Sequence, residues 1–318
     1  MPDNVKRVIA IVGPTGIGKS RLALHLAGIF HGEIVSADSR QVYRFLDIGT
    51  AKPSVEEIAR IPHHLINIVN PDEDFNLATY QEQVYRTIND IHQRGKLPFL
   101  VGGSGLYIKA VLEGWHIPKV SPDGNFRYNI EKKAKHGGAN ELYQELRAID
   151  PEAAAKIDPR NIRRVIRALE VNKRSNRQFS KLGYKDTPDF SSFTIGLNLE
   201  REELYRIVDR RVDEMIEHGL VEEVATLLKM GYDFTLRAMS GIGYRQIGQY
   251  LNGEISLEEA RRKIKTETHR FIRHQYAWFR LSDERIKWFD IAKQGDTEIE
   301  KAITEYLGSD NRETGKAR

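Results

Sequence analysis

The stretch RVIAIVGPTGIGKS, residues 7–20, decides the fold of this chain. Residues 8–12 form an uninterrupted apolar run rich in β-branched side chains, which is typical of a buried strand. A glycine-rich segment follows at once, and residues 21–30 then carry apolar side chains at helical spacing. The order of strand, glycine-rich turn and helix predicts the first unit of an α/β fold with a parallel sheet.

The glycine-rich segment matches the pattern G-x-x-x-x-G-K-[ST], which binds phosphate chains between a strand and a helix. Its residues are Gly13, Pro14, Thr15, Gly16, Ile17, Gly18, Lys19 and Ser20. Glycines let backbone N–H groups face inward, and the helix N-terminus adds partial positive charge. We expect Lys19 to reach the terminal phosphate and Ser20 to hold a Mg²⁺ ion. The pattern indicates a phosphate chain without showing that the chain belongs to a nucleotide.

The rest of the chain continues the alternation of strands and helices and then departs from it. Buried strands are predicted at 33–38, 96–103 and 193–199, with a helical stretch at 77–94. Further helices are predicted at 127–135, 140–148, 152–157, 160–174, 201–217, 219–230, 242–251 and 256–281. These patterns predict a P-loop NTPase-like parallel sheet with helices on both faces, plus a helical insertion domain. We place the discontinuous core at 1–114 and 190–308, the insertion at 115–189 and a frayed tail at 309–318.

Composition narrows the possible classes of protein. The 318 residues include no cysteine, which excludes disulfides and thiolate zinc sites. The ten histidines show no metal-ligand spacing beyond the adjacent His63 and His64, which we interpret as loop residues. No apolar run approaches the ~20 residues that span a bilayer, so we expect a cytoplasmic protein. The net charge of +4 does not by itself indicate nucleic acid, so the positions of the basic residues matter more.

One acidic residue is placed where it could serve catalysis. Asp38 ends the second predicted strand, at the carboxyl edge of the sheet near the phosphate loop, and is a candidate general base. The alternative is a turn or helix-capping aspartate, since Ser39 and Arg40 follow. The next strand ends in FLVGGSG, residues 99–105, with no acidic residue where a Walker-B aspartate would hold the metal. A routine NTPase is therefore disfavoured, whereas a small-molecule or nucleotide kinase and other transferases remain open.

Several further blocks of sequence resemble the bacterial type of the tRNA dimethylallyltransferase (isopentenyltransferase) family. They are DSRQVY at 38–43, LDIGTAKP at 46–53, PHHL at 62–65, GGSGLY at 102–107, RALEV at 167–171 and GIGYRQ at 241–246. With the P-loop, they follow one another in the order of the family, and kinases do not carry them.

The resemblance implies an activity. Family members transfer a dimethylallyl group from dimethylallyl diphosphate to N6 of adenosine 37, beside the anticodon of tRNA, and release pyrophosphate. Lys19, the loop amides and Mg²⁺ would bind the leaving diphosphate in a pocket that Thr15 lines, and Asp38 would accept the N6 proton. Ser104 would contact the adenosine once it has flipped out of the anticodon loop.

The resemblance also implies a set of tRNA-binding residues. They are Asp38, Ser39, Arg40, Gln41, Ser104, Arg127, Arg163, Arg164, Val165, Ile166, Arg167, Gly243, Tyr244 and Arg245. The spacing of Arg160, Arg163, Arg164 and Arg167 predicts four guanidinium groups on one helical face, with a merely solvated basic face as the alternative. Lys173, Arg174, Arg177 and Lys181 add to this charge. One departure from the pattern is Ser240, where some relatives carry an arginine.

A second basic band, residues 261–274, is a weaker candidate for a contact with the anticodon stem. We interpret Trp278 and Phe279, which follow it, as packing residues. Three hypotheses result: a monomeric prenyltransferase with Mg²⁺, tRNA and dimethylallyl diphosphate as its partners, a P-loop kinase, and a P-loop protein that binds nucleic acid without chemistry. The blocks of sequence favour the first.

Overall fold

The computed structural model describes residues 6–118, 120, 123–175 and 177–308. Six strands form one parallel sheet in the order β3-β2-β4-β1-β5-β6. Their bounds are β1 Arg7–Val12, β2 Gly32–Ser36, β3 His63–His64, β4 Leu97–Gly102, β5 Ser191–Asn198 and β6 Ile286–Asp290. The predicted α/β class with a parallel sheet is confirmed, and the predicted tail at 309–318 lies outside the described residues.

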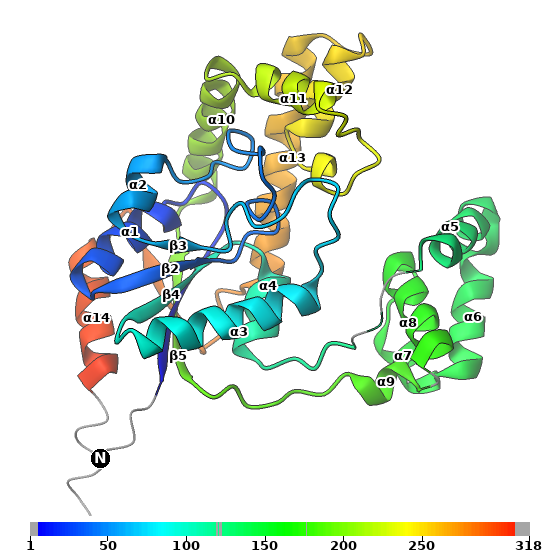
Figure 1. Cartoon of the computed structure of the whole chain (residues 1–318), viewed down its shortest axis with the longest axis horizontal. Coiled ribbons are helices and arrows are strands. Elements are labelled where there is room, and N and C mark those ends of the chain that lie inside the picture. The colour runs from blue at the N-terminus through cyan, green and yellow to red at the C-terminus, as the bar shows by residue number, and fades with distance from the viewer. Residues whose placement is uncertain (1–5, 119, 121–122, 176, 309–318) are drawn as a thin grey trace, which may run out of the picture. The chain divides into compact units, whose positions relative to one another are not determined.

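Helices cover both faces of the sheet (Figure 1). On one face, Val8, Ala10 and Val12 of the central strand β1 pack with side chains of α3 (Leu77–Gln93) and α4 (Gly105–Leu112). On the other, Ile9 and Ile11 pack with α1 (Lys19–Ile29) and α14 (Asp296–Gly308). This alternation follows from the strand geometry, because successive side chains point to opposite faces. A strand covered on both sides must be apolar throughout, as residues 8–12 are.

Of the remaining helices of this part of the chain, one lies between β2 and β3 in the sequence, and the others lie between β5 and β6. They are α2 Val55–Arg60, α10 Arg201–Glu217, α11 Leu220–Lys229, α12 Tyr244–Leu251 and α13 Leu257–Trp278, with a short 3₁₀ turn, η2, at Ala238–Ser240. No described helix is long and apolar enough to cross a membrane.

Sequence reasoning missed several short elements. His63 and His64 are not loop residues but form the edge strand β3, in which His64 Nε2 lies 2.7 Å from Glu33 Oε2. Strand β6 and helices α2, α4 and α14 were also not predicted. Two residues are too few to show a periodicity, and β6 carries the charged Lys287 between its apolar residues, so neither strand has a strong pattern.

The chain divides into two compact units: residues 113–188, and the segments 1–112 and 189–318 on either side of them. The insertion predicted at 115–189 has borders within two residues of those of the smaller unit. Within the smaller unit the helices are α5 Gly124–Lys133, α6 Ala139–Ile149, α7 Pro151–Lys156, α8 Ile162–Ser175 and α9 Phe179–Leu182, with a π-helical turn at Ala134–Gly138. Leu142, Leu146, Val165 and Leu169 form the centre of its own apolar core.

Candidate active site

The phosphate loop, residues 13–20, connects β1 to α1 as predicted. Gly16 and Gly18 adopt φ values of 79° and 88°, a region that side chains disfavour. A Cβ at Gly16 would also lie 2.4 Å from Cγ1 of Val208 on α10. The glycines of the pattern therefore serve both the curl of the loop and its close contact with α10.

Lys19 is the first residue of α1, and its Nζ donates to the carbonyl oxygen of Pro14 at 2.7 Å. Burial first, and then the charge of Arg211, lower the pKa of Lys19 to about 7 against the opposing effect of Asp38. Loss of solvent destabilises the charged form of Lys19, and a bound anion would stabilise it again. Lys19 is therefore a favourable partner for phosphate.

Asp38 follows β2 directly and shapes the turn after it. Its Oδ1 accepts hydrogen bonds from the backbone amides of Arg40, at 2.8 Å, and Gln41, at 3.4 Å. Through this oxygen, Asp38 does act as a turn aspartate, which was the alternative prediction. Oδ2 accepts no hydrogen bond from the part of the chain that the structure describes, and the Asp38 charge acts on Lys19 and Arg211. One carboxylate oxygen is therefore available to a substrate proton.

The carboxyl ends of three neighbouring strands bring the predicted catalytic residues to one edge of the sheet. Val12 is in register with Gly102, and Ser36 with Val101. The amide of Ala37 donates to the carbonyl of Val101 at 2.7 Å and extends the pairing to the residue before Asp38. Ser104 follows the end of β4 and is half-buried. Residues of the phosphate loop, Asp38 and Ser104 thus follow adjacent strand ends, as predicted for a parallel sheet.

Arg211 on α10 is a residue of this site that sequence reasoning missed. Burial lowers its pKa, while Asp38 and Glu214 act in the opposite direction. It forms no ion pair or hydrogen bond with any residue in the described ranges, although its charge acts on Lys19 and the charge of Asp38 acts on it. Its sequence context, DRRVDE at 209–214, looks like any solvated helical face, so only the fold could identify it.

The segment after Asp38 is tied to the C-terminal half of the larger unit. The Arg40 guanidinium donates to the carbonyl oxygens of Arg237 and Ala238 and to Ser240 Oγ, the last at 3.1 Å. Ser240, the departure noted above, therefore accepts from Arg40. Gln41 Nε2 donates to the carbonyls of Thr50 and Ala51, both at 3.2 Å. Ser39, which lies between Asp38 and Arg40 in the sequence, is half-buried.

Residues 243–245 combine a buried and an exposed side chain. Gly243 adopts φ 94° and precedes α12. Tyr244 is buried, and its hydroxyl donates to Glu223 Oε1 at 2.6 Å. That carboxylate also accepts from the amides of residues 47–49, so Tyr244 helps to hold the loop after Asp38. Arg245, in contrast, is exposed.

In the smaller unit the predicted basic face is only partly correct. Arg163 and Arg164 are exposed on α8, but Arg160 precedes the helix and pairs with Asp158 at 2.7 Å. The prediction that four guanidinium groups share one helical face was therefore wrong, because the helix starts only at Ile162. Val165 and Ile166, also predicted to touch tRNA, have side chains buried in the interior.

Two further arginines of this unit surround a buried acid. Glu170 is fully buried and accepts from Arg127 at 2.7 Å and from Arg167 at 2.6 Å. Arg167 also donates to the carbonyl oxygens of Pro118 and Val120. Both arginines thus have partners within the unit, a role that their sequence spacing did not indicate.

The second basic band, on α13, is largely paired with acids. Lys265 Nζ lies 2.8 Å from Asp213 and His269 Nε2 lies 2.8 Å from Asp209, both on α10, and Arg270 pairs with Glu267 within the helix. Phe279 is buried as predicted, whereas Trp278 is 37% exposed. These pairs favour a structural role for this band.

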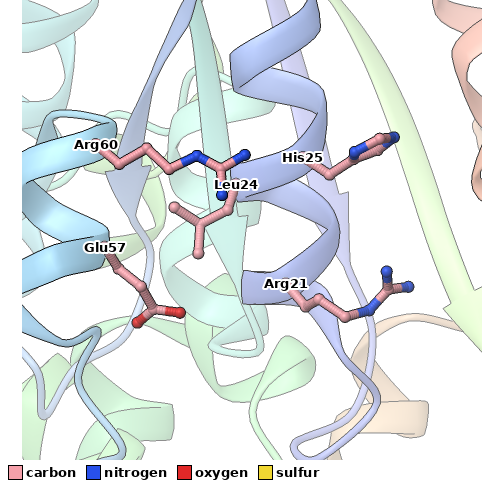
Figure 2. Close-up of a pocket in the computed structure, with 5 residues that line it drawn as sticks. All are labelled: Arg21, Leu24, His25, Glu57 and Arg60. Carbon is pink, nitrogen blue, oxygen red and sulfur yellow. The ribbon is translucent and has the colours of Figure 1, made fainter.

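A pocket of about 290 Å³ lies elsewhere, between α1 and α2 (Figure 2). Its lining residues are Arg21, Leu24, His25, Glu57 and Arg60. Arg21 is bonded to Asp296 at 2.9 Å and His25 lies 2.7 Å from Glu300, and in Figure 2 both extend away from Glu57 and Arg60. With these groups already paired, the pocket is a weaker candidate than the sheet edge.

Comparison with known proteins shows the family of this chain. Residues 41–282 match the model of a family described as IPP transferase. The chain is 50% identical over 306 residues to the tRNA dimethylallyltransferase of Dehalococcoides mccartyi, which covers 96% of this chain and 94% of that protein. It is similar to the crystal structure of the tRNA isopentenylpyrophosphate transferase of Bacillus halodurans, with a TM-score of 0.72, 39% identity and coverage of 98% and 99%. A eukaryotic dimethylallyltransferase acting on tRNA gives a TM-score of 0.73 at 28% identity, with coverage of 96% and 80%.

Proposed function

The chain belongs to the IPP transferase family and is a tRNA-modifying prenyltransferase, and from this premise we propose how its residues carry the reaction. We propose that N6 of adenosine 37 attacks C1 of dimethylallyl diphosphate, that the bond from C1 to the diphosphate oxygen breaks, and that pyrophosphate leaves. The observation that carries the proposal is one carboxylate, Asp38, whose charge acts on two half-buried cations, Lys19 and Arg211.

The two cations suit the leaving group. Negative charge builds up on the diphosphate as the bond to carbon breaks, so Lys19, Arg211 and the loop amides bind the transition state more tightly than the ground state. Removing a single such donor typically costs a factor of about 10² to 10³ in rate. Both cations are half-buried and lack an ion pair with a described residue, so a bound anion meets no competing carboxylate bonded to them.

Asp38 is the proposed general base. An exocyclic adenine amine is a weak nucleophile, and its proton must be accepted as the new carbon–nitrogen bond forms. Oδ1 is committed to the turn, whereas Oδ2 remains for N6. Ser104, at the next strand end, is proposed to contact the same base after it leaves the anticodon-loop stack.

Ser20 fits a Mg²⁺ ion that arrives with the diphosphate. Ser20 is exposed on the first turn of α1. The described ranges contain no cluster of three or more acidic or histidine residues that could hold a metal without the substrate. Mg²⁺ usually keeps several waters and binds through one or two protein groups plus substrate phosphates. When bound, it would neutralise charge on the leaving group.

Contacts with tRNA are proposed for exposed and half-exposed groups. Arg163, Arg164 and Arg245 are exposed cations for phosphate, and Ser39, Arg40 and Gln41 follow the proposed base. For Arg127, Arg167 and Tyr244 we propose that they support the surface by holding Glu170 and Glu223. One chain carries the whole constellation, so we also propose a monomer acting on tRNA in the cytoplasm.

The test is transfer of label from ¹⁴C-dimethylallyl diphosphate to an unmodified anticodon stem-loop with adjacent adenosines, with Mg²⁺ and without ATP. We expect labelled RNA and released pyrophosphate. Asp38→Asn should lower kcat by about 10² to 10⁴ and leave diphosphate affinity unchanged, because the base acts only on the proton. Asp72→Asn, in an exposed loop, is the matched control.

Two other outcomes would assign a different function. Transfer of labelled γ-phosphate from ATP, with no transfer of the prenyl label, would establish a kinase. RNA binding with neither reaction would leave a binding protein.

A further inference from the structure

One side-chain amide joins the phosphate loop to the turn that carries Ser104. Gln275, on α13, is 3% exposed. Its Oε1 accepts from the backbone amide of Thr15 at 2.9 Å, and its Nε2 donates to the carbonyl oxygen of Gly103 at 3.0 Å. The two backbone groups belong to segments that follow β1 and β4, and Gln275 is far from both in sequence.

The fit around this amide is tight. A Cβ at Gly103 would lie 2.1 Å from Gln275 Nε2, and one at Gly105 would lie 2.3 Å from Cβ of Trp278. Only glycines allow the last turn of α13 to approach the residues on either side of Ser104 this closely. The position of Ser104 therefore depends on α13 and not only on its own strand.

The hydrogen bonds also decide which loop amides are free. Thr15 N–H is occupied by Gln275, so the amides that remain for phosphate are those of Gly16 and the residues after it. The site requires an acceptor toward Thr15 and a donor toward Gly103. A neutral amide meets both needs with one side chain, and so does a protonated carboxylic acid, whereas a carboxylate meets only the first.

We infer that Gln275 is a positioning residue that sets the diphosphate site and the adenosine site relative to each other through Thr15 and Gly103. The inference rests on the proposed function, in which the phosphate loop holds the leaving group and Ser104 contacts the base. A misplacement of about 1 Å between reacting groups costs on the order of 10²-fold in rate. Loss of the amide should therefore lower turnover without removing any group that touches the substrates.

The experiment compares Gln275→Met and Gln275→Glu with the unaltered chain in the prenyl-transfer assay. Methionine fills similar space but makes neither hydrogen bond, so we expect kcat to fall about 10- to 100-fold at every pH. Glutamic acid should keep most of the activity while protonated, and lose it as pH rises and the carboxylate repels the Gly103 carbonyl. The activity ratio of Gln275→Glu to the unaltered chain should thus decline with pH, whereas the ratio for Gln275→Met stays flat.

Two further measurements separate positioning from general destabilisation. Ile264→Val, on the same helix and buried, controls for a weakened α13 and should retain full kcat at a matched melting temperature. Hydrogen exchange of the peptide that contains Thr15 should accelerate in Gln275→Met but not in Ile264→Val, and this readout needs no substrate.

The outcomes are distinct. If the unaltered chain transfers no prenyl group, the proposed function fails, and the exchange measurement still tests the contact. If the unaltered chain is active and Gln275→Met matches it in kcat and in both KM values, the positioning role is overturned. A flat activity ratio for Gln275→Glu across pH, together with a kcat loss equal to that of Ile264→Val, would overturn it as well.

Discussion

The phosphate edge of the larger unit and the α8 region of the smaller one both concentrate positive charge, but they hold it differently. At the phosphate edge, Lys19 and Arg211 are half-buried without an ion pair to a described residue, and the loss of solvent lowers both pKa values. In the smaller unit, Arg127 and Arg167 are bonded to the buried Glu170, and Arg163 and Arg164 are exposed. The cations of the first arrangement have no anionic partner among the described residues, whereas the buried Glu170 partly neutralises the second arrangement.

This difference shows that availability, not the number of basic residues, distinguishes a binding cation from a structural one. A partly buried cation without a partner carries an electrostatic cost that a ligand can remove. A cation bonded to a buried carboxylate stabilises the fold instead. The following predictions test the contrast.

The largest expected effect is on the stability of the smaller unit. Glu170→Ala leaves Arg127 and Arg167 without their shared partner, and removing one side of a buried pair costs about 3 to 5 kcal/mol, with the low end expected because both arginines keep some exposure. Urea unfolding of the full chain, followed by a probe in residues 113–188, measures the change. Glu145→Ala, exposed on α6, is the control.

The same three side chains predict a pH dependence. Burial would raise the pKa of Glu170, but hydrogen bonds from Arg127, the Asp123 amide and Arg167 outweigh it and lower the pKa. The stabilisation should therefore be complete above the ordinary glutamate pKa and be lost as pH falls through the lowered value. An unfolding free energy of this unit that stays constant between neutral and acid pH in the unaltered chain would contradict the assignment.

The next effect is on turnover. Arg211→Gln should reduce kcat by about 10² to 10³, because a cation at the developing negative charge is lost. Affinity for the anticodon stem-loop should not change. Arg210→Gln, on the neighbouring exposed position of α10, should leave kcat within about twofold of the unaltered chain. Equal losses in the two variants would show that Arg211 has no special place in the site.

A smaller effect concerns proton uptake. The Lys19 pKa of about 7 in the free site should rise when the diphosphate binds, so the complex takes up a proton at neutral and higher pH. Affinity for dimethylallyl diphosphate should then fall as pH rises above about 7, by at most about tenfold per pH unit. Calorimetry in buffers of different ionisation enthalpy measures the uptake. Lys19→Arg, which stays charged, should show none.

The smallest effect is at the exposed arginines. Arg163→Ala should weaken stem-loop binding and lower the slope of log K against log salt concentration by about 0.7 to 0.9, the contribution of one phosphate contact. Arg160→Ala should change the slope less, because Arg160 already pairs with Asp158. Fluorescence anisotropy at several salt concentrations provides both values. A larger change for Arg160→Ala would reverse the comparison between the two positions.

Some features of this protein were predictable from local sequence. Residues 7–20 determine the first strand, the phosphate loop and the start of α1, because apolar periodicity and glycine placement act over short distances. The position of Asp38 at a strand end likewise followed from the order of elements, since the carboxyl ends of parallel strands share one edge. The blocks of residues outside the loop indicated the family.

Other features depended on contacts between segments distant in sequence. Arg211 reaches the phosphate edge only because α10 packs against Gly16, and Gln275 does so only because glycines at 103 and 105 admit α13. Glu170 turns Arg127 and Arg167 into structural partners through burial, which spacing along a helix does not encode. Sequence by itself thus determined the phosphate loop, the candidate base and the family. Only the tertiary structure decided which cations remain available, because availability depends on burial and on partners brought from elsewhere in the chain.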